Sequence, residues 1–136
     1  MRALSLFVLA NPDQIKAEAE AMTPLLGRIE VLASRTGLVM LPYRDTVRGA
    51  DFFLGEVLAA EAHIRCPDKG VEGYAMVVGH DLERAMAAAI LDAVGAAEVD
   101  PGRFEAFLAH IGEALARSEL AERRAVEATR VQMDTF

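Results

Sequence analysis

Residues 71–94 read VEGYAMVVGHDLERAMAAAILDAV, a strand and a helix joined across a glycine. Apolar residues lead up to Val78, Gly79 ends the strand, and Asp81 is placed to cap the helix that follows. The helix carries few charges, so it must be covered on more than one side. Its many alanines allow its backbone to approach a sheet or a partner closely. The stripe expected to face the core comprises Leu82, Met86, Ala89, Ile90 and Ala93.

A second helix is expected before this unit. Asn11 is placed as its cap and Pro12 at its first position, and the helix should end at Gly27. Its apolar residues recur at helical spacing, which predicts a helix over residues 12–26 with one buried face. That face comprises Ile15, Ala19, Met22 and Leu26.

The hydrophobic period changes to two after residue 27, which predicts strands over residues 28–78. A tight turn at Ser34–Gly37 is expected to form a hairpin from the segments on either side of it. A polar loop covers residues 44–50, and the Pro and Gly of residues 67–70 predict another turn. The sheet should therefore be a four-stranded antiparallel meander. Its expected strands are 28–33, 38–43, 52–66 with a bend at Gly55, and 72–78.

A long final helix is expected over residues 101–133. Its apolar stripe meets the polar residues Ser118 and Glu122, so the helix should cover the sheet to about Leu115 and then bend or leave the body. The tail from about residue 116 is either an arm that docks on a partner or an uneven cap on the chain's own core. The clear part of the stripe comprises Phe104, Phe107, Leu108, Ile111 and Leu115.

These elements predict one α+β domain over residues 1–136. Helices within residues 1–26 come first, the sheet occupies residues 28–78, and two helices follow over residues 81–133. The long C-terminal helix and the helices before it should cover the antiparallel sheet.

The composition is apolar for a soluble chain of this size. Of 136 residues, 53% are hydrophobic, and the mean hydropathy is +0.22. We therefore expect another subunit to cover part of the surface, and the isolated chain to form homo-oligomers. The net charge of −7 argues against nucleic acid or an anionic membrane as a partner, because both attract clustered Lys and Arg.

The sequence favours a cytoplasmic protein. Cys66 is the only cysteine, so no internal disulfide is possible. Residues 1–10 are better explained as a packed helix than as a signal peptide, because Leu4, Phe7 and Val8 share one helical face. No segment approaches the roughly 20 apolar residues that span a membrane.

Few residues suggest catalysis or metal binding. The histidines are His63, His80 and His110, and their spacing does not match a zinc site, so neither a bound metal nor a bound cofactor is expected. His80 beside Asp81 could act as an acid–base pair, although helix capping with a solvated imidazole explains the same residues. Cys66 falls on an apolar strand face, where a thiol is usually inert.

Glu61, His63 and Arg65 should form a row on one face of their strand. They are a carboxylate, a base and an anion-binding group. If a partner subunit supplied the opposite side, they could line a composite site between the two chains. A solvated or interface face of an antiparallel sheet explains the same alternation. Arg44 and Arg48 in the polar loop give only a weak anion-binding signal, since the pattern of a phosphate loop is missing.

Several short motifs, in this order, resemble the PhnG family of the bacterial carbon–phosphorus lyase system. The resemblance extends from residue 9 to residue 136. The matching motifs are Thr36-Gly37-Leu38-Val39, Phe52-Phe53-Leu54-Gly55-Glu56, Gly73-Tyr74, Val78-Gly79-His80-Asp81, Glu83-Arg84-Ala85, Leu91-Asp92-Ala93 and Thr129-Arg130-Val131.

The resemblance implies a helper subunit that acts with the partner subunits PhnH, PhnI and PhnJ. Together they would transfer an alkylphosphonate to the ribose of ATP with release of adenine, giving α-D-ribose 1-methylphosphonate 5-triphosphate. ATP would be a substrate of the complex. S-adenosylmethionine and an iron–sulfur cluster would belong to a partner subunit, which cleaves the carbon–phosphorus bond in a later step. The resemblance carries no catalytic residues to this chain.

Two other functions fit the residues. The chain could contribute Glu61, His63 or Arg65 to an active site at a subunit boundary. It could instead be a non-enzymatic α+β scaffold or a small-ligand-binding domain, which would need a closed apolar pocket within one chain.

Overall fold

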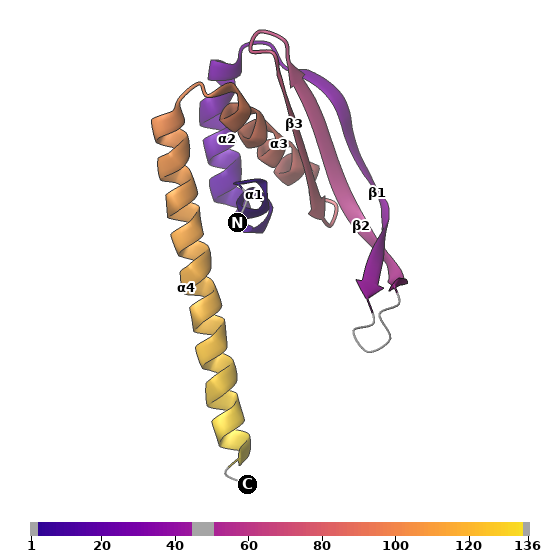
Figure 1. Ribbon diagram of the computed structural model, residues 1–136, viewed down its shortest axis with the longest axis vertical. Helices are drawn as coiled ribbons and strands as arrows, with labels where there is room; N and C mark the ends of the chain where they lie inside the picture. The colour runs from indigo at the N-terminus through magenta and orange to yellow at the C-terminus, as the bar shows by residue number, and fades with distance from the viewer. Residues whose placement is uncertain (1–2, 45–50, 135–136) are drawn as a thin grey trace.

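The computed structural model describes residues 3–44 and 51–134, with side chains for residues 3–40 and 55–125. It is an α+β fold in which a three-stranded antiparallel sheet, ordered β1-β2-β3, packs against helices (Figure 1). The elements in chain order are α1 (Ala3–Leu9), α2 (Pro12–Leu26), β1 (Glu30–Arg44), β2 (Asp51–Cys66), β3 (Val71–Val78), α3 (Leu82–Ala97) and α4 (Pro101–Asp134).

The first two helices form as the sequence predicts. The Asn11 side chain accepts a hydrogen bond of 2.9 Å from the backbone N of Asp13, and α2 ends before Gly27. In α1, Phe7 is buried and meets the ring of Phe104 edge-on, with 5.9 Å between the ring centroids. The buried residues of α2 are the expected ones, Ile15, Ala19, Met22 and Leu26.

The expected four-stranded meander is wrong, because no turn forms at Ser34–Gly37. These residues lie within β1, where Ser34 pairs with Ala62 and Gly37 with Ala59 of β2. The local turn signal is overridden because the long β2 strand offers backbone partners to both halves of the segment. One uninterrupted strand therefore replaces the predicted hairpin.

The turn predicted over residues 67–70 is confirmed. The pairing of β1 with β2 shifts register between Leu41 and Pro42, directly after the pair of Leu41 with Gly55, the residue where a bend was expected. The turn after β2 is closed by a hydrogen bond of 2.9 Å from Gly70 N to Cys66 O, with Gly70 at φ 67°. The expected loop over residues 44–50 falls outside the described residues except for Arg44, which is the last residue of β1.

Helix α3 lies at the centre of the fold, between the sheet and the helices α1 and α2. The expectation that it is covered on more than one side is confirmed. The expected stripe is only partly correct, since Leu82 is exposed while Met86 and Ile90 are half-buried. Burial from two sides widens the buried arc beyond a single stripe. The buried residues are Ala85, Ala87, Ala88, Ala89, Leu91, Ala93 and Val94.

Helix α4 packs against α1 and α3 and not over the sheet, which corrects the expectation that it covers the sheet. The sheet face is already occupied by α3, so α4 adds to the helical side, where Ile111 is buried. Beyond Leu115, residues 116–125 are all exposed. The helix continues without a break and leaves the body (Figure 1). Its 34 residues give a length of about 50 Å.

A second projection extends from the sheet. Strand β3 pairs only with residues 59–66 of β2, so β1 and β2 continue beyond it as a two-stranded ribbon. Both this ribbon and the end of α4 point away from the body towards the same end of the molecule (Figure 1).

Candidate interaction site

The outer face of the sheet, opposite α3, carries the predicted row of Glu61, His63 and Arg65. Glu61 is its best-connected member. Its Oε1 accepts a hydrogen bond of 2.8 Å from Arg35 Nε, and its Oε2 accepts one of 2.6 Å from the Tyr74 hydroxyl. These contacts, first Tyr74 and then Arg35, lower the pKa of the Glu61 carboxyl. Glu61 is therefore a weak base at neutral pH.

The other two members of the row engage different carboxylates. His63 Nε2 lies 3.7 Å from Glu72 Oε2, and its ring meets Tyr74 edge-on. Arg65 contacts Glu30 at 3.2 Å. Each member is thus paired with a neighbouring strand, and the row forms a network across the sheet rather than a cluster around a reacting atom.

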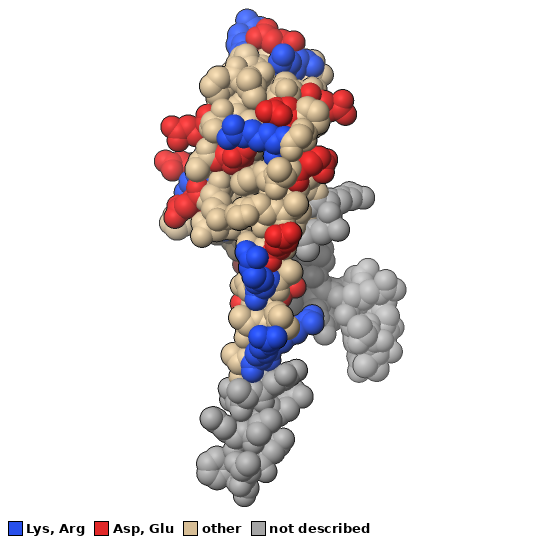
Figure 2. Space-filling view, turned by 90° about the vertical axis from the view of Figure 1, so that its left-hand side faces the viewer, with Lys and Arg blue, Asp and Glu red and all other residues tan. Residues whose placement is uncertain are grey.

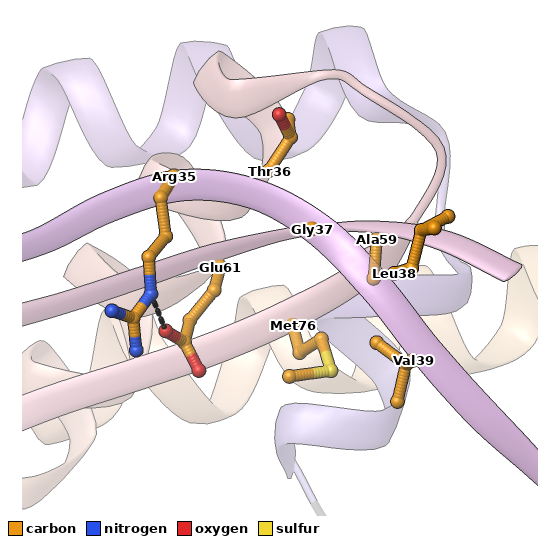
Figure 3. Close-up of a pocket in the computed structure, with 8 residues that line it drawn as sticks. All are labelled: Arg35, Thr36, Gly37, Leu38, Val39, Ala59, Glu61 and Met76. Atoms are coloured by element: carbon orange, nitrogen blue, oxygen red, sulfur yellow. Dashed lines mark hydrogen bonds and ion pairs between the residues drawn. The ribbon is translucent and has the colours of Figure 1, made fainter. Parts of the chain in front are cut away.

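A shallow hollow of about 160 Å³ lies beside the Arg35–Glu61 pair. Gly37 and Ala59 form its floor, and Val39 and Met76 lie across from the charged pair (Figure 3). The Arg35 side chain is 74% exposed and uses only its Nε towards Glu61. Within the described side chains, its terminal amino groups have no hydrogen-bond partner, so they can bind a ligand or a partner carboxylate. Thr36 and Leu38 point to the opposite side of the sheet.

Apolar side chains remain uncovered on both faces of the sheet. On the face shared with α3, the helix does not reach the ribbon, so Leu38 is 68% exposed and Met40 and Leu58 are also exposed. On the outer face, Met76 and Val78 are exposed, Val78 to 76%. Exposed apolar area of this kind is typical of a surface that another protein covers.

A family comparison decides the assignment. The family model for the phosphonate metabolism protein PhnG matches residues 1–136, which is the whole chain. The chain belongs to the PhnG family. The family resemblance seen in the sequence is confirmed, and it assigns the chain to phosphonate metabolism. Among the described residues, no helix of this PhnG-family chain is long and apolar enough to cross a membrane.

The junction of β3 and α3 is a helix cap in this PhnG-family chain. Asp81 Oδ1 accepts a hydrogen bond of 3.0 Å from Arg84 N, and Oδ2 accepts one of 3.1 Å from Lys16 Nζ. These bonds lower the pKa of the Asp81 carboxyl. Because both oxygens are engaged and His80 is exposed, the geometry favours capping over an acid–base pair.

The remaining candidates show no reactive arrangement. Cys66 is buried in the core, and burial raises the pKa of its thiol, which keeps it protonated. His110 is exposed on α4. Among the described side chains, no group of three His, Cys, Asp or Glu residues could hold a metal ion. The side chains of Arg44 and Arg48 fall outside the described set.

The sequence reasoning missed two charged residues of α3. The Arg84 guanidinium donates through Nη2 to the Val8 carbonyl at the end of α1. Asp92 Oδ2 accepts a hydrogen bond of 3.0 Å from Tyr74 N on β3, and burial raises the pKa of the Asp92 carboxyl. A charge within an alanine-rich, buried helix is the signal that could have identified both.

Proposed function

We propose that this chain is a non-catalytic subunit of a cytoplasmic carbon–phosphorus lyase complex. With PhnH, PhnI and PhnJ it would support transfer of an alkylphosphonate to the ribose of ATP. The observation that carries this proposal is the apolar surface left uncovered on the projecting ribbon, at Leu38, Met40 and Leu58. Surfaces of this kind are typical of obligate subunits, whose interfaces resemble an opened core.

In the proposed reaction a phosphonate oxygen attacks the anomeric carbon of the ribose of ATP. A carbon–oxygen bond forms while the bond from that carbon to adenine breaks, and adenine leaves. In this proposal the partner subunits supply the groups that bind the two anionic substrates. The charge of −7 on this chain supports that division of roles, because like charges repel.

The later cleavage of the carbon–phosphorus bond would also take place on a partner. Iron–sulfur clusters are held by several cysteine thiolates. This chain has one cysteine, Cys66, and its side chain is buried, so its residues do not fit such a cluster. In this proposal the cluster, and S-adenosylmethionine with it, belong to a partner subunit.

A second candidate function is a contribution to an active site at a subunit boundary. The open amino groups of Arg35 and the hollow beside Glu61 favour it, because a partner could close that hollow. A stand-alone ligand-binding domain has less support. The hollow lined by Lys16, Met86 and Ile90 measures about 260 Å³, while ligand pockets are usually larger, about 300–1,000 Å³.

Reconstitution tests the proposal. The purified partners are assayed for release of adenine from ATP and methylphosphonate, with and without this chain. We expect release to depend on the chain and Leu38→Asp to abolish assembly. Leu25→Asp, which changes an exposed leucine on α2, serves as the matched control and should leave assembly intact. Unchanged adenine release without the chain would refute the proposed function.

One variant separates the two candidates. Glu61→Ala should leave both assembly and adenine release intact if the chain is non-catalytic. Loss of release from a fully assembled complex would favour the boundary site instead.

A further inference from the structure

The edge of the sheet at β1 carries unpaired backbone groups. Gly79 N donates a hydrogen bond of 2.8 Å to Leu58 O, which shows that the backbone groups of Leu58 point towards β3. Backbone direction alternates along a strand, so Ala59 and Glu61 point the other way, towards their β1 partners Gly37 and Arg35. The intervening residues of β1 therefore point away from the sheet. They are Ser34, Thr36, Leu38 and Met40.

The two edges of the sheet differ. On the β3 edge, Tyr74 N donates to Asp92, so α3 blocks the edge at that point. Within the described residues, the outward amides and carbonyls of the β1 stretch have no hydrogen-bond partner in the chain. Figure 1 shows β1 as the outermost strand on its side of the fold. The regular stretch lies between a register shift near Leu32 and Pro42.

We propose that an extended strand from a neighbouring subunit adds to β1 over residues 33–41. This inference rests on the proposed function, which supplies the neighbouring subunits. Unpaired amides and carbonyls along a strand edge are complementary to the backbone of another extended strand. Natural edge strands are usually protected by lysines, prolines or bulges, and this stretch contains none of them.

The side chains beside the edge define the chemistry of the incoming strand. Leu38 and Met40 are exposed on the face shared with α3, so the strand should place apolar residues beside them. On the outer face, Arg35 presents its free amino groups, so the strand should carry an aspartate or glutamate there. The incoming segment is therefore apolar on one face and acidic at one position of the other.

A second copy of this chain fits less well. In an antiparallel pair of two β1 strands, one residue lies opposite its own copy. If that residue is Thr36, Arg35 lies opposite Gly37 of the other copy. If it is Gly37, Arg35 lies opposite Val39. Centring on Arg35 places the two guanidinium groups opposite each other. None of these arrangements gives Arg35 a carboxylate, and both copies carry a net charge of −7. A partner strand with an acidic residue avoids both problems.

Residue-resolved hydrogen–deuterium exchange tests the inference on the unmodified protein. Exchange is measured for the isolated chain, at a concentration where light scattering shows a monomer, and for its complex with PhnH, PhnI and PhnJ. The amides of Thr36, Leu38 and Met40 should exchange at least 100-fold more slowly in the complex. Those of Arg35, Gly37 and Val39 face β2 and should be protected in both samples.

A proline variant provides a second test. Thr36→Pro removes one outward amide and no bond to β2, whereas Thr36→Val keeps that amide and is the matched control. We expect the proline variant to assemble at least tenfold more weakly than the valine variant. Circular dichroism confirms that both are folded.

The outcomes distinguish the two proposals. A complex that assembles with freely exchanging β1 amides refutes strand addition and leaves the proposed function standing. Failure of the complex to assemble refutes both. Protection of the same amides in the isolated chain at high concentration identifies a second copy as the occupant and also refutes the inference.

Discussion

Gly73 of β3 lies directly against the carbonyl oxygen of Ala89 on α3. A Cβ added at Gly73 would overlap that oxygen and would also come within 3.0 Å of the Ala93 Cβ. The closest approach of helix and sheet therefore depends on a missing side chain. Because neither backbone can move without disturbing the core around it, the contact fixes the height of α3 above the sheet.

Gly73→Ala should therefore destabilise the fold. We expect the free energy of unfolding to fall by about 1–3 kcal/mol, as for other overpacked cores. Urea unfolding followed by circular dichroism measures it. Gly112→Ala is the matched control, since a Cβ at this helical position of α4 meets no atom within 4 Å. The control should gain about 0.5–1 kcal/mol, and equal losses in both variants would contradict the close contact.

The network around Glu61 predicts a pH dependence. The pKa of Glu61 is lowered in the folded state, first by the Tyr74 hydroxyl. Its stabilising contribution is therefore present above the pKa of an unfolded glutamate and is lost as pH falls through the lower, folded value. Tyr74→Phe should raise the pKa of Glu61, measured by NMR titration of its carboxyl carbon. An unchanged pKa would show that the Tyr74 hydroxyl does not contribute to the shift.

Asp92 should behave in the opposite sense. Burial raises the pKa of its carboxyl, so the charged form is disfavoured in the fold. Its contribution is most favourable below the pKa of an unfolded aspartate and is lost as pH rises through the folded value. Asp92→Asn keeps an oxygen that can accept the Tyr74 N–H bond, and it should unfold at a higher temperature than the parent at pH 7. The difference should shrink towards pH 3, whereas a variant less stable at pH 7 would contradict this account.

The cap at Asp81 can be separated from catalysis. Asp81→Ala removes the oxygen that accepts from Arg84 N and should lower the unfolding temperature. Asp81→Asn keeps an acceptor and should restore most of that loss. In the assembled complex, His80→Ala should release adenine at the parent rate, and a large loss of rate would revive the acid–base interpretation.

The end of α4 should be dispensable for folding. Residues 116–125 are all exposed and carry three arginines and two glutamates, Arg117, Glu119, Glu122, Arg123 and Arg124. Charged side chains of both signs lie along the protruding part of α4 (Figure 2). Ending the chain after residue 116 should change the free energy of unfolding by no more than about 0.5 kcal/mol. The same truncation should weaken assembly with the partners. A strongly destabilised product would instead support the alternative that this part of α4 covers the chain's own core.

The sequence predicted local features well. Asn11, Pro12 and the apolar spacing of α2 depend on neighbouring residues, and helix, cap and buried face all formed as expected. The polar residue Ser118 likewise indicated where α4 leaves the body, because one interrupted stripe cannot stay buried. The outward row of Glu61, His63 and Arg65 followed from the strand period alone.

The predictions that were wrong concern contacts between residues that are far apart in the sequence. The turn residues Ser34–Gly37 join one strand only because residues 59–62 of β2 pair with them. The position of α4 likewise depended on α3 already occupying the sheet. In the candidate site, the contacts of Glu61 with Arg35 and Tyr74 come from two other strands, so register alone brings them together.

The burial of Cys66 has a practical consequence. Cys66 is the only cysteine in the chain, and its thiol is buried in the core and protonated. It should therefore resist maleimide and iodoacetamide while the core stays closed. The rate at which Cys66 is alkylated therefore measures how often the core opens. A fluorophore attached at a new surface cysteine would label a single known position without first removing the native thiol.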